Sequence, residues 1–193
     1  MDKCKWCNKK FDEDAMVSLS LNENEPSMLI CNKCYNEYMA DLLNVANCEG
    51  FEEEATFKDC DDLDHTFQII KRISPMGGLW EATEFLDGDK IGYLFSIHQD
   101  FEDNPNETLK MLYKKIENGL SRKFIEKEIL YGREHCGLKN EKVEGRIEWD
   151  GRHEENIPKF IIDGEEYSLN EIGRMIMSYE GWNFKLEITE QTE

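Results

Sequence analysis

At 193 residues with 39% apolar side chains, the chain is long enough for a small N-terminal module and one further domain with its own core. Its 23 Lys and Arg stand against 42 Asp and Glu, a formal charge of −19, which disfavours nucleic-acid phosphates and anionic membranes as ligands. Charged residues interrupt the first positions, so we expect no secretory signal, no transmembrane segment and a cytoplasmic location.

Two Cys-x-x-Cys pairs stand near the N-terminus. Cys4 and Cys7 form the first pair, and Cys31 and Cys34 form the second. Two sulfurs three residues apart can hold one metal ion from a tight turn, and two such turns complete a tetrahedral shell. A shell of four thiolates is typical of structural Zn²⁺ and leaves no open position for a substrate. The spacing therefore predicts a structural zinc site.

Two other assignments of the cysteines stay open. A pair of disulfides would need an oxidising compartment, which the odd count of seven cysteines and the charged N-terminus disfavour. Cys48 or Cys60 could replace one of the four ligands, although neither has a paired neighbour. We expect Cys48, Cys60 and Cys136 to be free thiols.

The segment between the two pairs favours a β-hairpin. Residues 16–21 alternate between apolar and polar, residues 22–27 are rich in turn formers, and residues 28–30 are apolar. After Cys34 the apolar residues recur at helical spacing to about Asn47. This order predicts a treble-clef zinc finger over residues 1–47. It is similar to the treble clef that caps the Clp protease unfoldase, a module used for dimerisation and adaptor binding, which favours a protein partner.

Residues 48–64 form an acidic segment. From Glu49 to Asp64 there are eight acidic residues and one basic residue, Lys58. We interpret the segment as a solvated linker, with docking on a basic partner as the alternative.

Residues 65–132 predict three antiparallel strands and a helix. The strands cover residues 67–73, 79–86 and 91–97, joined by turns at 74–78 and 87–89. Asn104 as N-cap, followed by Pro105 and Glu107, begins a helix that we expect to run to Tyr131 and end at Gly132. Its apolar stripe predicts packing on the sheet. Its polar face is expected to expose the basic residues Lys110, Lys114, Lys115, Arg122, Lys123 and Lys127.

Residues 133–193 predict two strands, a helix and a closing strand. The strands cover residues 143–149 and 159–162, with a turn at 163–164. Ser168 and Glu171 form a capping box for a helix that ends before Gly181. Residues 182–188 alternate like a half-buried strand. The fold class is thus α+β, a zinc finger followed by a body with antiparallel strands in the orders βββα and ββαβ, and residues 65–193 could be one domain.

The C-terminal residues also carry a family resemblance. Four short runs resemble a bacterial domain of unknown function, namely GRIEW at 145–149, PKFIIDG at 158–164, EIGRM at 171–175 and YEGWNFKL at 179–186. In that family a cysteine-paired finger commonly precedes such a domain. The resemblance covers most of the chain and implies architecture without implying an activity.

Three local groups could in principle support catalysis, although the common motifs of nucleotide-binding, acyl-transfer and zinc-hydrolase enzymes do not occur in the sequence. His98 could act as a general base oriented by Asp100, Glu81 and Glu84 as an acid/base pair, and Cys136 as a thiolate nucleophile beside Glu134 and His135. Neighbours in sequence seldom meet in a site, so we expect each group to be structural.

Three tryptophans are candidate contact residues. Trp80, Trp149 and Trp182 could anchor a protein partner if exposed, or pack in a core if buried. We expect a cytoplasmic interaction or regulatory protein whose zinc finger is a docking platform. Two alternatives stay open. One is an enzyme with a site assembled in the α+β body, and the other is a nucleic-acid role, through Lys3, Lys5, Lys9 and Lys10 or by acidic mimicry of DNA. The oligomeric state is left open.

Overall fold

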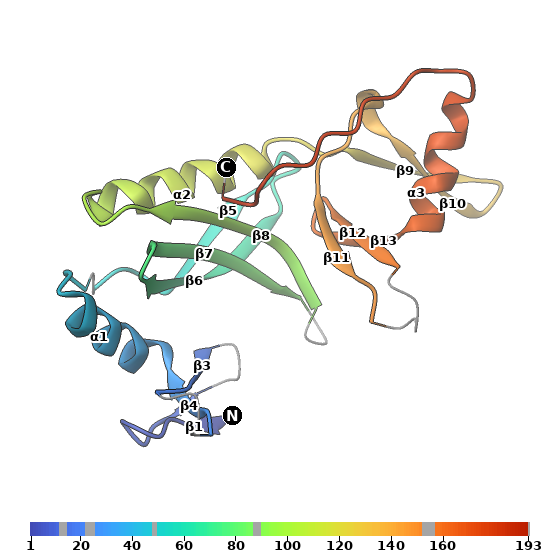
Figure 1. Ribbon diagram of the computed structural model, residues 1–193. Helices are drawn as coiled ribbons and strands as arrows, with labels where there is room; N and C mark the ends of the chain where they lie inside the picture. The colour runs from blue at the N-terminus through green and yellow to red at the C-terminus, as the bar shows by residue number, and fades with distance from the viewer. Residues whose placement is uncertain (12–14, 22–25, 48–49, 87–89, 152–156, 193) are drawn as a thin grey trace.

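The computed structural model describes residues 1–11, 15–21, 26–47, 50–86, 90–151 and 157–192 (Figure 1). The described elements are mixed α and β, and their strands pair antiparallel, as the α+β prediction requires. They fall into an N-terminal part (residues 1–47), a middle part (residues 50–121) and a C-terminal part (residues 122–192).

The N-terminal part contains two small hairpins and one helix. Its elements are β1 (Asp2–Lys3), β2 (Lys10–Phe11), β3 (Met16–Leu19), β4 (Met28–Cys31) and α1 (Asn32–Leu43). Helix α1 ends earlier than its apolar pattern suggests, because Asn44 adopts a left-handed conformation with φ 54°. Its backbone N–H then donates to the carbonyls of Ala40 and Asp41, which closes the helix.

The middle part is a four-stranded sheet with one helix across a face (Figure 1). The strands follow chain order and the helix comes last: β5 (Glu54–Lys58), β6 (Asp64–Ser74), β7 (Gly77–Leu86), β8 (Lys90–Gln99) and α2 (Pro105–Leu120). Apolar residues of the strands and the predicted stripe of α2 form its core: Phe67, Ile69, Trp80, Ala82, Leu112, Ile116 and Leu120. Burial of each large side chain stabilises the fold by about 1.5–3 kcal/mol.

The acidic segment is built into this sheet, which corrects its interpretation as a solvated linker over residues 48–64. Strand β5 pairs with β6 from Glu54↔Gln68 to Lys58↔Asp64. Ala55 and Phe57 pack against the core, while the alternate residues Glu54, Thr56 and Lys58 are exposed. The alternation of period two therefore outweighs the high density of charge.

The predicted helix over residues 105–131 is too long. Helix α2 ends at Leu120, and a hairpin follows, made of β9 (Ile125–Leu130) and β10 (Arg133–Leu138). Tyr131 and Gly132 have φ of 53° and 76°, which matches the two-residue turn that closes right-twisted hairpins. Gly132 thus marks a strand turn and not the end of a helix.

The C-terminal part adds a three-stranded sheet and a short helix to that hairpin. These elements are β11 (Arg146–Trp149), β12 (Pro158–Ile162), β13 (Glu165–Ser168) and α3 (Leu169–Ile176), with single 3₁₀ turns at Lys139–Glu141 and Met177–Tyr179. The predicted capping box is present: Ser168 Oγ accepts from Glu171 N, and the Glu171 carboxylate accepts from Ser168 N.

The closing strand predicted over residues 182–188 is wrong. These residues are in no described strand and run back toward β8 and α2 (Figure 1). Near the end of the segment, Gln191 O accepts from Lys115 Nζ at 2.9 Å and from Ser96 Oγ at 3.4 Å. Four apolar side chains are left largely in solvent: Trp182 (65% exposed), Phe184 (92%), Leu186 (74%) and Ile188 (71%).

Helix α1 packs against the end of β6, so the N-terminal part is joined to the middle part. Met39 and Ala40 share a small core with Ile73. Strand β5 stops short of this end of β6, and the Asn36 side chain takes its place. Asn36 Nδ2 donates to Lys71 O at 2.7 Å, and Asn36 Oδ1 accepts from Ile73 N at 2.9 Å.

Candidate functional site

A tight turn after β1 positions the first cysteine pair. Cys4 N donates to Lys9 O at 2.9 Å, and Asn8 N donates to Cys4 O at 3.0 Å. Asn8 has φ 64°, a left-handed conformation that asparagine tolerates better than most residues. The turn directs the Cys4 and Cys7 sulfurs to one side.

The start of α1 positions the second pair. Cys31 ends β4 and is also the N-cap residue of α1, and Cys34 lies in the first turn of that helix. Cys31 N donates to Cys4 Sγ at 3.2 Å, which connects the two pairs directly. A hairpin and a helix start therefore converge on the turn that carries the first pair.

The four sulfurs form one compact cluster, the cysteine cluster of Cys4, Cys7, Cys31 and Cys34. All four Sγ atoms lie within 4.8 Å of one another, and Cys7 Sγ lies 3.8 Å from Cys31 Sγ. A tetrahedral ion with metal–sulfur bonds of about 2.3 Å separates its ligands by about 3.8 Å, whereas a disulfide joins sulfurs at about 2.05 Å. All four cysteines are free, so the disulfide alternative does not hold.

The electrostatics of the cluster also suit a cation. Burial opposes ionisation of Cys4, but backbone N–H groups at Cys7, Cys31 and Trp6 outweigh it and lower the Cys4 pKa to about 6. Burial and the neighbouring sulfurs raise the pKa of Cys34. A divalent cation among the sulfurs would favour the thiolate form of all four. Four sulfur donors in this geometry fit Zn²⁺, or an iron ion of the same coordination.

The remaining cysteines stand apart from this cluster. Cys60 is exposed at the end of β5, and Cys136 is half-buried on β10. Neither belongs to the metal-competent group found among the described residues. Cys48 lies outside the described residues.

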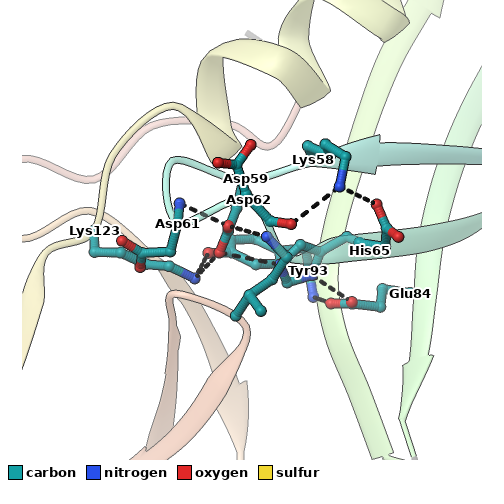
Figure 2. A network of polar contacts seen from close by, with 10 residues as sticks. Lys58, Asp59, Asp61, Asp62, His65, Glu84, Tyr93 and Lys123 are labelled. Atoms are coloured by element: carbon teal, nitrogen blue, oxygen red, sulfur yellow. Dashed lines mark hydrogen bonds and ion pairs between the residues drawn. The ribbon is translucent and has the colours of Figure 1, made fainter.

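A second polar cluster lies between the middle and C-terminal parts (Figure 2). Its side chains come from the β5–β6 turn, from β6, β7 and β8, and from the segment after α2. Asp59 Oδ2 contacts Lys123 Nζ at 2.8 Å and His65 Nε2 at 3.3 Å. His65 Nδ1 lies 2.6 Å from Glu84 Oε1, and Glu84 Oε2 accepts from Tyr93 N at 3.1 Å. We call Asp59, His65, Glu84, Tyr93 and Lys123 the junction network.

Charge pairing inside the junction network is strong. Burial would raise the pKa of Asp59, but the Lys123 ammonium and the N–H groups of Leu63 and Asp61 outweigh it and hold that pKa below its ordinary value of 3.8. Burial would lower the pKa of Lys123, but the Asp59 carboxylate raises it above 10.5. Both groups are charged at neutral pH. The pair therefore persists across the physiological range.

The side chains of the junction network make polar contacts with one another. Both ring nitrogens of His65 already face carboxylates, so neither is available to take a substrate proton. Burial raises the pKa of Tyr93 to about 12, which disfavours its phenolate. Lys123 contacts both Asp59 and Tyr93, and Gly164 packs against the Tyr93 ring. These contacts fix the C-terminal part on the sheet.

Three family models match the chain. Residues 3–46, 49–121 and 124–193 match in turn the domains of unknown function DUF7685, DUF7686 and DUF7713. The breaks fall after α1 and after α2, and the acidic segment belongs with the sheet. No curated protein and no solved structure matches the chain. None of the described helices is long and apolar enough to cross a membrane.

The three candidate catalytic groups, which we expect to be structural, differ in how their side chains lie. His98 Nε2 lies 3.3 Å from Asp100 Oδ1, and the two side chains are 41% and 73% exposed. Glu81 pairs with Arg72 at 2.7 Å, whereas Glu84 belongs to the junction network. Glu81 and Glu84 therefore contact different partners and do not form a pair with each other.

The His135 and Cys136 pair is also separated. The pleat of β10 places these neighbours on opposite faces of the hairpin. Burial and the Glu134 carboxylate raise the pKa of Cys136, which disfavours a thiolate nucleophile.

The three candidate tryptophans differ in exposure. Trp80 is fully buried, and its Nε1 donates to Gln99 Oε1 at 2.7 Å. It has no surface to offer a partner, and its role is packing. Trp149 (66% exposed) and Trp182 (65%) remain accessible.

The sequence does not predict the junction network, because its members fall in segments with different expected structures. Asp59 lies in the expected linker, and Lys123 lies on the polar face of the expected helix. One signal was present at Asp59, where Oδ1 accepts from Asp61 N at 2.8 Å and from Leu63 N at 3.0 Å. An aspartate whose side chain can bond the backbone N–H two residues on is typical of a tight turn. Asp59 therefore indicates a turn, and with it a β5–β6 hairpin.

Proposed function

We propose that the protein is a zinc-stabilised interaction module, in which the N-terminal part is a treble clef that presents a docking surface. The observation that carries the proposal is the compact set of four free sulfurs with a 3.8 Å separation suited to a tetrahedral ion. Such a shell is closed, so the metal would support structure and would offer no position to a substrate.

Metal analysis tests the first half of this proposal. Protein purified without added metal should carry one zinc per chain, and Cys31→Ser should lose it, whereas Cys60→Ser should keep it. Iron at one equivalent, or less than about half an equivalent of zinc, would contradict the assignment.

The docking surface that we propose is an open groove beside the cysteine cluster. It has a volume of about 770 Å³ and is lined by Asp2, Lys3, Lys5, Pro26, Ser27, Met28 and Leu29. Two lysines stand next to an apolar floor, and Leu29 is 40% exposed. This chemistry suits a protein segment with an acidic residue beside an apolar anchor.

Lys5 N donates to Leu29 O at 3.0 Å, so the first cysteine turn is bonded to β4. The two walls of the groove are thereby tied to the chain segments that the metal would hold. Metal binding would keep the groove preformed, which lowers the cost of ordering it on binding.

Affinity capture from the native host tests the docking role. Lys5→Glu combined with Leu29→Ser should lose a partner that the parent protein retains, with zinc content unchanged. Lys33→Glu combined with Leu42→Ser makes the same chemical changes on exposed positions of α1 and is the matched control. Identical captures by both variants, or no captured partner, would contradict the docking role.

A further inference from the structure

The extended segment 182–188 and strand β11 are each incomplete, and they complement each other. Within the described residues, segment 182–188 belongs to no sheet, and β11 is an edge strand paired only with β12. Ile147 is 51% exposed and Trp149 66% exposed, so β11 also lacks cover on one face. Exposed apolar side chains next to an open strand edge are typical of an interface.

The uncovered face of β11 continues the face of the three-stranded sheet that packs on the core of the C-terminal part. Ile147 pairs with Phe160, which pairs with Tyr167, and paired residues point to the same face. Tyr167 is buried in the core of the C-terminal part. An added strand with apolar residues on this face would therefore continue an existing core.

The sequences of the two strands fit in one antiparallel register. Opposing Ile147 with Leu186 also opposes Trp149 with Phe184, so the apolar residues share the open face. On the other face the same register opposes Arg146 with Glu187 and Glu148 with Lys185, two pairs of opposite charge. A shift of two residues opposes Arg146 with Lys185 in one direction and Glu148 with Glu187 in the other, and both are repulsive.

The partner strand has to come from a second copy. Strand β11 ends at the foot of the C-terminal part in Figure 1, whereas α3 runs upward and ends at the top. Residue 182 follows the end of α3 closely, so it emerges far from the end of β11 in its own chain. Antiparallel pairing in the favoured register would place residue 182 beside Gly151, at that distant end.

We propose that the protein forms a two-fold dimer in which residues 182–188 of each copy add as a fourth strand to the edge of β11 in the other. The exchange is reciprocal, as a two-fold interface requires. Strand addition supplies main-chain hydrogen bonds, and the alternating side chains supply the register.

Light scattering on the full-length, metal-loaded chain tests the dimer. Over about 1 to 100 μM we expect a concentration-dependent shift from monomer to dimer. Lys185→Glu places a glutamate opposite Glu148 twice per dimer, so it should weaken association about tenfold or more. Lys110→Glu makes the same charge change on an exposed side chain of α2 and should leave association unchanged.

Two further readouts separate this interface from others. Leu186→Pro removes a backbone N–H from the added strand and should also weaken the dimer, while amides of residues 183–188 should exchange slowly only in the dimer. A protein that stays monomeric throughout, with those amides open or protected, overturns the proposal. So does a dimer that Lys185→Glu and Leu186→Pro leave unchanged.

Discussion

At the scale of single residues, the Asn36 side chain bonds the edge of β6 at a position where no described strand pairs with that edge. Strand β5 reaches Gln68 of β6 in the ladder, and the edge beyond it would leave backbone groups of Lys71 and Ile73 without a strand partner. The side-chain amide of Asn36 donates to Lys71 O and accepts from Ile73 N, as a neighbouring peptide group would. The residue is buried, so water cannot replace it.

Asn36→Leu should therefore lower the free energy of unfolding by about 1–3 kcal/mol, because the buried Ile73 N–H loses its acceptor, while Lys71 O keeps only the bond from Asn32. Urea denaturation of the metal-loaded protein measures the change. Asn32→Ala is the matched control, since Asn32 also donates to Lys71 O but carries a buried Oδ1 with no partner, and its loss should cost less than about 1 kcal/mol. Equal costs for the two variants would contradict this role.

Lys123 is the second residue with a large expected effect. Lys123→Met leaves the buried Asp59 carboxylate without its ammonium partner, and breaking a buried pair in this way costs about 3–5 kcal/mol. Lys127→Met removes an exposed pair with Glu165 and should cost at most about 1 kcal/mol. Denaturation curves that coincide for the two variants would show that the junction network does not stabilise the protein.

The same pair predicts how stability varies with pH. The folded-state pKa of Asp59 is depressed, so its contribution is present above its ordinary value of 3.8 and is lost as pH falls below that value. The pKa of Lys123 is raised, so its contribution is present below 10.5 and is lost only as pH rises beyond it. The difference in unfolding free energy between the parent protein and Lys123→Met should be flat from about pH 5 to 9 and shrink toward pH 3. A maximum near pH 7 with losses on both sides of it would contradict the assignment.

At the scale of elements, local signals with a stereochemical meaning were read correctly from the sequence. The N-cap Asn104 and the capping box of Ser168 and Glu171 are present as predicted, because each depends only on contacts within four residues. The end of α2 was missed, since Phe124 and Ile129 continue the apolar stripe of the helix in the sequence, whereas Ile129 lies on β9 and is 79% exposed. The strand prediction for residues 182–188 failed for another reason. The alternation specifies which residues share a face, but no described strand of the same chain pairs with the segment.

Alanine substitutions at two glycines test the turn assignment, and they should change the stability of the protein in opposite directions. Gly132 has φ 76° in the β9–β10 turn, whereas Gly173 is inside α3, and a Cβ would meet no atom within 4 Å at either position. Gly132→Ala should destabilise by about 1 kcal/mol through backbone strain alone. Gly173→Ala should stabilise by about 0.5–1 kcal/mol through helix propensity. Thermal unfolding of both variants gives the two signs, and a stabilising Gly132→Ala would mean that the turn is assigned wrongly.

At the scale of the whole molecule, the cysteine spacing predicted the cluster, but not the way in which the N-terminal part is joined to the sheet. Four ligands at two fixed spacings specify one local geometry, and the structure brings their sulfurs together. The packing of Met39 and Ala40 on Ile73 depends on residues more than thirty positions apart. No local pattern encodes such a contact, so it could not be predicted from periodicity.

Metal removal should for this reason affect the sheet as well as the N-terminal part. Chelation under reducing conditions should loosen the start of α1 and release Asn36 from β6. We expect the Ile73 amide to exchange with solvent at least about tenfold faster, while amides in the centre of β7 keep their protection. Unchanged exchange at Ile73 in metal-free protein would show that α1 stays docked without the metal.

The start of helix α1 carries residues with two different roles. Cys31 and Cys34 belong to the cysteine cluster, while the side chains of Asn32 and Asn36 bond to the edge of β6. A newly made chain that has not acquired its ion would therefore display an unfinished strand edge, the feature from which aggregation starts and which chaperones bind. If the cysteine cluster binds a metal, its supply would in this way act as a checkpoint on the maturation of the whole protein, although the four cysteines lie outside the sheet that the ion would help to complete.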